Sequence, residues 1–96
     1  MRIIWTETAR RARQQATAYI AAQNRAAALD VLDEVSRQTI LLRDHPEMRR
    51  KGRRQGTREF IIARTPFLVV YRYLPKSDTI EILHFLHGAQ QWPPKR

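Results

Sequence analysis

Residues 67–87 read FLVVYRYL, PKSD and TIEILHFLH in succession, and this stretch decides the fold. Its first and last segments are rich in β-branched and aromatic residues, which fit the pleated, half-buried surface of a sheet. The segment between them, 75–78, combines proline with serine and aspartate, which is typical of a tight turn. We therefore predict two antiparallel strands, 67–74 and 79–87, joined by that turn.

A third strand is predicted immediately upstream, over 57–64, where the apolar run 60–62 precedes a Thr65-Pro66 turn. Two successive hairpins indicate an antiparallel meander. The apolar run 2–5 near the start of the chain predicts one more strand. The tail, 88–96, holds two consecutive prolines, so we expect the meander to end before it.

Two helices are predicted between the first strand and the meander. Over 8–22, apolar residues recur at spacings of three and four, and Thr6 is a suitable N-cap. Asn24 is the predicted N-cap of a second helix, which should end near Arg43 because Pro46 disfavours helical geometry at the residue before it. The short connection favours an antiparallel helical hairpin. The expected fold is α+β, in the order β-α-α-β-β-β, with the hairpin packed on a mostly antiparallel sheet.

Composition narrows the class of protein. The 96 residues suggest a single domain, 1–96, and the hydrophobic share of 43% is too high for a disordered chain. No cysteine is present, so neither a disulfide nor a thiolate metal site is expected. No apolar stretch is long enough for a membrane span or a secretion signal, and we expect a cytoplasmic protein. Eighteen basic residues against nine acidic ones give a net charge of +9, which points to an acidic partner.

Several short phrases, in a fixed order, extend over nearly the whole chain. They are Ile3-Ile4-Trp5, the spaced alanines from Ala9 onward, Tyr19-Ile20-Ala21, Asn24-Arg25-Ala26-Ala27-Ala28, His45-Pro46, Gly56-Thr57-Arg58-Glu59, the strand from Pro66 to Arg72, and the closing phrase from His87 to Pro93. No single phrase is specific, but their order resembles the RelE/ParE superfamily of toxins from bacterial type II toxin–antitoxin systems. The resemblance implies the same β-α-α-β-β-β fold.

Two activities are known in that superfamily, and the resemblance is closer to the ParE branch. One group cuts messenger RNA on the ribosome, and the ParE group blocks DNA gyrase without chemistry of its own. The nuclease group places an arginine where this chain has Leu68, and a tyrosine where this chain has Gly88 and Ala89. Leucine cannot stabilise a phosphate, so the expected function is inhibition of gyrase. A ribonuclease and a degenerate paralogue that only binds an antitoxin are the alternatives.

The resemblance also implies a set of partners. A cognate antitoxin with an extended or helical segment is expected to wrap the toxin, and acidic residues on it would complement the charge of +9. Operator DNA is expected to be contacted only through the antitoxin. No cofactor is expected, and the three histidines show no metal-ligand spacing.

The most basic segment is the predicted loop over 45–56. Its cations are Arg49, Arg50, Lys51, Arg53 and Arg54. Such a loop can bind nucleic-acid phosphates through release of counterions. A simply solvated loop and a docking site for an acidic antitoxin are together the favoured interpretations, because no aromatic platform for bases accompanies the cations.

Candidate binding residues occur on the predicted strands and the tail. Arg58, Arg64 and Arg72 are predicted on strands and could bind carboxylate or phosphate, although exposed charges that protect sheet edges are more common. Trp92 could fold back on the sheet or contact a partner. We expect a partner or target to bind at these tail and strand positions.

Histidine is the residue most suited to acid–base catalysis near neutral pH. His87 closes the last strand, and it is the catalytic candidate only if the protein is a ribonuclease. His84 lies three residues earlier, so it should point to the other face of the sheet. Without converging partners, a structural role for His87 is favoured and no catalytic residue is assigned.

Overall fold

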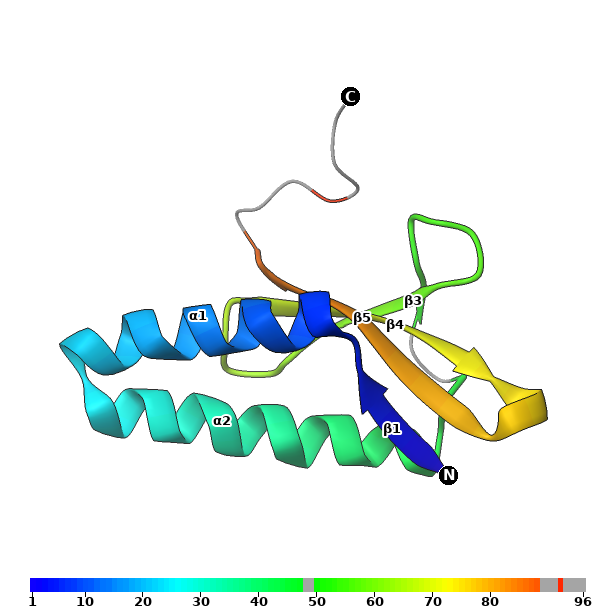
Figure 1. Ribbon diagram of the computed structural model, residues 1–96, viewed down its shortest axis with the longest axis horizontal. Coiled ribbons are helices and arrows are strands. Elements are labelled where there is room, and N and C mark those ends of the chain that lie inside the picture. The colour runs from blue at the N-terminus through cyan, green and yellow to red at the C-terminus, as the bar shows by residue number, and fades with distance from the viewer. Residues whose placement is uncertain (48–49, 89–91, 93–96) are drawn as a thin grey trace.

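In the computed structural model, residues 1–47, 50–88 and 92 are described. The helices and strands are β1 (Arg2–Trp5), α1 (Glu7–Gln23), α2 (Arg25–Ile40), β2 (Arg50–Lys51), β3 (Arg58–Ile61), β4 (Phe67–Leu74) and β5 (Thr79–His87). The strands form one sheet in the order β1-β5-β4-β3-β2. All neighbouring strands are antiparallel except β1, which runs parallel to β5. The predicted α+β class and the helical hairpin on a mostly antiparallel sheet are confirmed (Figure 1).

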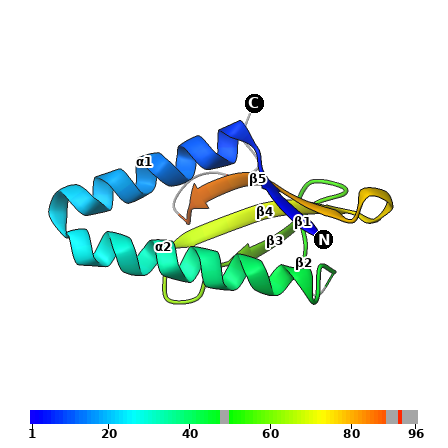
Figure 2. The same cartoon turned by 60° about the horizontal axis from the view of Figure 1, so that its bottom comes forward.

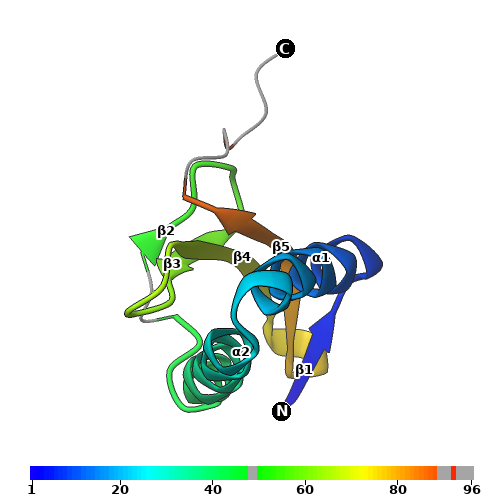
Figure 3. The same cartoon turned by 90° about the vertical axis from the view of Figure 1, so that its left-hand side faces the viewer.

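Both helices cover the same face of the sheet. Figure 2 shows α1 and α2 antiparallel in front of β3, β4 and β5, and Figure 3 shows both helices end-on, on one side of the sheet. The loop between β2 and β3 lies on the other side of the sheet from the helices (Figure 3). The sheet therefore has a helix-covered face, which carries the main core, and a helix-free face.

The structure corrects two of the predictions and refines a third. The segment predicted as an irregular loop contains β2, which extends the sheet to five strands because Arg50 and Lys51 pair with β3. Strand β3 ends at Ile61, three residues early, so Arg64 lies in the following turn with φ at 66°. A left-handed backbone cannot continue a strand. The α-helical part of the second helix ends at Ile40, and a 3-10 turn, η1 (Leu41–Arg43), completes it.

A bulge in β5 keeps Ile80, Ile82 and Phe85 on the helix-covered face. Val70 faces His84 while Tyr71 faces Ile82, so Leu83 is an extra residue in the ladder. The hydroxyl of Thr6, the N-cap of α1, donates to the Leu83 carbonyl at 3.2 Å and accepts from the Ala9 amide at 3.2 Å. The Thr6 side chain thus caps the helix and also hydrogen-bonds the backbone carbonyl of the bulged residue.

The main core lies between the helices and the sheet. Its buried members are Ala9, Val35, Leu42, Phe60, Ile62, Phe67, Val69, Tyr71, Ile80, Ile82 and Phe85. The helix-free face has a smaller cluster of its own, formed by Leu68, Val70 and Trp92, with Leu86 against it. The second cluster indicates that this face is not simply a solvated surface.

The end of the β3–β4 hairpin is fastened to α2 through Glu34. Its carboxylate accepts from Arg64 at 2.5 Å, and from Arg37 and Gln38 at 2.6 Å each. Gln38 in turn accepts from the Ala63 amide at 2.7 Å. The Arg64–Glu34 and Ala63–Gln38 contacts join residues 30 and 25 positions apart. The hydrogen bonds from Arg64, Gln38 and Arg37 lower the pKa of Glu34 to about 2.

This network predicts a pH-dependent share of the stability. Because the folded-state pKa of Glu34 is lowered, its contribution is complete above the ordinary carboxyl pKa and is mostly lost as the pH falls to about 2. We expect Glu34→Gln to reduce the free energy of unfolding near neutral pH and to have little effect at about pH 2. Urea titrations at both pH values measure this, with Asp33→Asn as the matched control. Equal effects of Glu34→Gln at both pH values would contradict the prediction.

Candidate functional site

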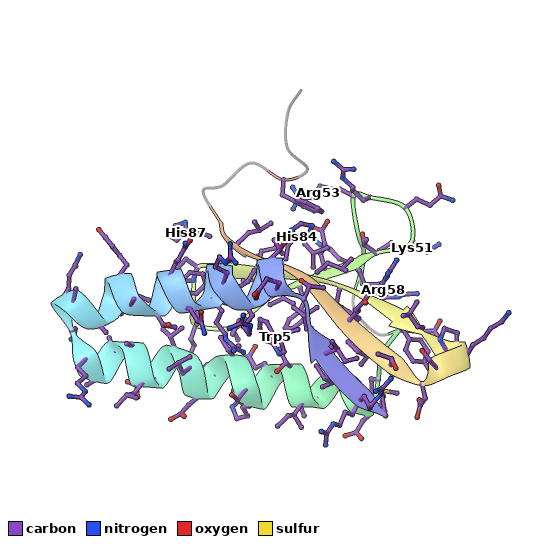
Figure 4. The ribbon with its side chains drawn as sticks, in the orientation of Figure 1. Trp5, Lys51, Arg53, Arg58, His84 and His87 are labelled. Carbon is purple, nitrogen blue, oxygen red and sulfur yellow. The ribbon has the colours of Figure 1, made fainter. Side chains whose placement is uncertain are left out.

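The helix-free face is organised around a buried carboxylate, that of Glu59 on β3. Glu59 is 1% exposed. Its carboxylate oxygens accept hydrogen bonds from the Arg53 guanidinium at 3.0 Å and from the Arg53 amide at 2.8 Å. Arg50, its cross-strand partner, donates from 3.2 Å. The indole N–H of Trp92 donates from 3.0 Å. Glu59 thus joins β3, the β2–β3 loop and Trp92 in one network, with His84 and Arg53 on this side (Figure 4).

Glu59 remains ionised despite its burial. Burial by itself raises the pKa of this carboxyl, but the hydrogen bonds from Arg53 and Trp92 and the charge of Arg53 outweigh that effect. The pKa therefore lies below its ordinary value. A buried charge that is fully hydrogen-bonded holds its donors in place, because separating them would leave it unpaired.

Trp92 covers the apolar part of the helix-free face. It is 8% exposed and packs on Leu68 and Val70. The imidazole of His84 lies against its ring, with centroids 4.3 Å apart, and the Arg54 guanidinium lies 5.5 Å from the ring centroid. Burial lowers the pKa of His84, with the positive charge of Arg54 acting in the same direction, so the imidazole is neutral near pH 7.

A basic hollow, here called the basin, lies beside this network at the edge of the sheet. Its volume is about 440 Å³. The lining residues are Glu47, Lys51, Gly52, Arg54, Gln55, Gly56, Thr57, Arg58, Tyr73 and Pro75. Strands β2 and β3, the loop between them and the β4–β5 turn therefore all contribute to it.

An apolar groove lies on the helix-covered side, between α1 and the adjoining ends of β4 and β5. Its volume is about 410 Å³. Its lining is formed by Ala12, Gln15, Ala16, Tyr19, Ile20, Pro66, Phe67, Phe85 and His87. Tyr19 is 69% exposed, which is high for an aromatic side chain. The small side chains of α1, Ala12 and Ala16, leave this groove open.

The predicted candidates do not come together in one site. His87 lies at the rim of the groove, where its ring makes an edge contact with Phe67 at 5.8 Å. His84 lies on the opposite face, as predicted. Arg64 is in a turn rather than on a strand, paired with Glu34, and Arg72 pairs with Glu81 across the strands at 2.6 Å.

The remaining candidates gather near the network and the basin. Arg58 lines the basin, and its guanidinium donates to the Glu47 carbonyl at 3.0 Å. In the basic loop, Arg50 and Arg53 hold Glu59, whereas Lys51 and Arg54 line the basin. Arg49 lies outside the described residues. Among the residues that are described, no cluster of His, Cys, Asp or Glu could hold a metal ion.

Sequence reasoning missed Glu59, which is the centre of the helix-free face. In the sequence, Glu59 stands out only as the last residue of the Gly56-Thr57-Arg58-Glu59 phrase. The signal that could have found it is a single acid on an apolar strand that follows a run of cations: such an acid needs partners if it is buried. Its other partner, Trp92, is 33 residues away along the chain, which no local pattern reveals.

Three comparisons with known proteins bear on identity. The family model described as the ParE toxin of the type II toxin–antitoxin system, parDE, matches residues 3–92. A protein of Sinorhizobium fredii named "Putative toxin Y4kP" is 36% identical over 92 residues, which cover 96% of this chain and 93% of that protein. A chain of the chromosomal ParDE system from P. aeruginosa shares the fold, with a TM-score of 0.80 at 20% identity over 91% of this chain and 95% of that one.

Proposed function

The chain belongs to the ParE toxin family, and from that premise we propose that it inhibits DNA gyrase, blocks growth and is neutralised by a cognate antitoxin. It is the toxin of a ParDE-type toxin–antitoxin system. The proposed mode of action is non-catalytic: the toxin binds its target and needs no cofactor. The proposed location is the cytoplasm, where gyrase works, and no helix in the described part of the chain could cross a membrane.

One observation supports gyrase inhibition over RNA cleavage. Leu68, which stands where the nuclease group of the superfamily has an arginine, is buried beneath Trp92. The carboxylate of Glu59 contacts this cluster through the Trp92 indole and would repel a phosphate, and Arg50 and Arg53 are already paired with that carboxylate. A ribonuclease needs cations that converge on the scissile phosphate, and here the position is covered and apolar.

The groove on α1 is the proposed docking site for the antitoxin. An amphipathic segment of the antitoxin would place apolar side chains against Ala16, Tyr19 and Phe85, in the way that helices bind apolar grooves. Acidic residues beside that segment would meet the arginines on the polar side of α1 and speed association. Contact with operator DNA is assigned to the antitoxin.

Inhibition of supercoiling by the purified toxin is the first test. We expect the toxin to inhibit gyrase, and the antitoxin added in equal amount to restore supercoiling. His87→Ala should inhibit as well as the wild type does, because no proton transfer is involved. Relaxation of the same plasmid by a type I topoisomerase serves as the control for effects on DNA alone.

Two outcomes would contradict this proposal. If gyrase is unaffected at toxin concentrations that stop growth, and messenger RNA is cut on programmed ribosomes, the toxin is a ribonuclease, and His87→Ala should then abolish cleavage. If expression does not slow growth although the antitoxin binds, the chain is the degenerate paralogue.

A further inference from the structure

The solvent-exposed side of α2 carries large apolar side chains. Leu29, Leu32 and Ile40 are all exposed, Leu29 to 55% and Ile40 to 50%. Their spacings along the helix, three and eight residues, bring them to the same side, whereas the buried residues of α2 lie on the side that meets the core. An exposed apolar stripe of this kind marks a surface that binds another protein.

An open groove separates this stripe from α1. Its volume is about 270 Å³. The side chains that α1 contributes include the small ones of Thr17, Ala18 and Ala21, and those from α2 include Leu29 and Leu32. One surface therefore carries both projecting leucines and a hollow lined by small residues, so its shape can be complementary to a second copy of itself.

The charges on this side of α2 are also self-complementary. Arg25 and Asp33 lie four residues before and four residues after Leu29, and both are exposed. Among the residues that the structure describes, neither takes part in an ion pair. If two α2 helices cross antiparallel at Leu29, position 25 of each copy lies opposite position 33 of the other. The two-fold arrangement therefore forms the Arg25–Asp33 contact twice.

We propose that two copies of this chain associate through the hairpin face, formed by Arg25, Leu29, Leu32 and Asp33 with the groove beside them. In this dimer the leucines of each copy pack against the small side chains of the other. The two reciprocal ion pairs set the antiparallel orientation. An interface of this kind is isologous, because the same patch serves on both subunits.

The local charge favours a second copy over an acidic antitoxin segment as the occupant of the hairpin face. Helix α2 contains two cations and three acids, although the whole chain has a net charge of +9. An acidic segment is attracted more strongly to other surfaces, whereas two toxin copies can meet here with little repulsion. The groove proposed for the antitoxin lies between α1 and the ends of β4 and β5, so the dimer leaves it open. The inference goes beyond the proposed function and does not rest on it.

Sedimentation velocity of the purified toxin alone, over a range of concentrations, tests the inference. We expect the wild type to reach twice the mass of the 11.4 kDa chain. Leu29→Asp places two like charges at the two-fold axis and should give a monomer. The matched control is Ile61→Asp, which makes the same kind of change at an exposed position on β3 and should leave the dimer as in the wild type.

Charge reversal tests the two-fold arrangement itself. Arg25→Glu and Asp33→Arg, each alone, bring like charges together twice, and each should raise the dissociation constant of the dimer at least about tenfold. The variant with both reversals has opposite charges at the two positions again, so we expect it to dimerise nearly as the wild type does. Such a rescue requires position 25 of one copy to lie against position 33 of the other.

Three results would overturn the inference. One is a wild type that stays monomeric at every concentration, and in that case a loss of antitoxin affinity in Leu29→Asp would assign the hairpin face to the antitoxin. Another is an equal loss of dimer in Leu29→Asp and Ile61→Asp. The third is a double reversal that dimerises no better than the single ones. All the substituted positions are exposed, and circular dichroism checks that each variant is folded. Because gyrase is absent from these measurements, a failure here leaves the proposed function intact, and a failure to inhibit gyrase leaves the dimer intact.

Discussion

Replacing Glu59 with alanine is expected to lower the free energy of unfolding by about 3 kcal/mol, because the Trp92 indole N–H and the Arg53 amide lose their acceptor, at about 1–3 kcal/mol for each buried donor left unpaired. The carboxylate is 1% exposed and receives hydrogen bonds from Arg50, Arg53 and Trp92. For a domain of this size the loss corresponds to a decrease in Tm of roughly 10–20 °C. Urea denaturation followed by circular dichroism measures it.

The matched control is Glu81→Ala, which removes another strand carboxylate from an ion pair with an arginine. The Glu81 side chain is 25% exposed and pairs with Arg72 at the surface, so the expected loss is below about 1 kcal/mol. A double-mutant cycle between Glu59→Ala and Trp92→Phe should show a coupling of about 1 kcal/mol or more. Equal effects of the two glutamate variants, or no coupling, would mean that Glu59 does not hold Trp92 in place.

The second large effect is expected from Phe85→Ala, with a loss of about 3–5 kcal/mol in the free energy of unfolding. Phe85 is buried where β5 meets α1. Its ring stacks on that of Phe67 with centroids 4.9 Å apart, and its centroid lies 6.2 Å from that of the Trp5 ring. Alanine would leave a cavity that these rings cannot fill. It would also widen the groove proposed for the antitoxin.

Thermal and urea unfolding of Phe85→Ala measure this loss, with Ile61→Ala as the control. Ile61 is 62% exposed on β3, so its truncation should change the stability by less than about 0.5 kcal/mol. If Phe85→Ala is nearly as stable as the wild type, the packing of α1 on β5 is not the main support of the core. The antitoxin affinity of Phe85→Ala can be compared only where the variant is folded.

Local patterns alone determined most of the elements. The bounds predicted for 67–74 and 79–87 match β4 and β5 because β-branched and aromatic residues and a proline turn act within a few positions. Thr6 and Asn24 were correctly identified as N-caps, since capping depends only on the first turn that follows. The order of the short phrases also indicated the toxin family, and the match to the ParE family model confirms it.

The tertiary structure alone decided how those elements create sites. It placed β1 parallel to β5, formed β2 from a segment with no apolar periodicity, and brought Trp92 onto Glu59. Arg64 was predicted on a strand but lies in a turn, because its backbone is left-handed. Its guanidinium donates to the carboxylate of Glu34, which is 30 residues away along the chain. Ion pairs and buried charges depend on distances in space, which periodicity within one segment does not encode. The same cations could therefore be counted from the sequence, but only the fold separates those that hold Glu59 from those that line the basin.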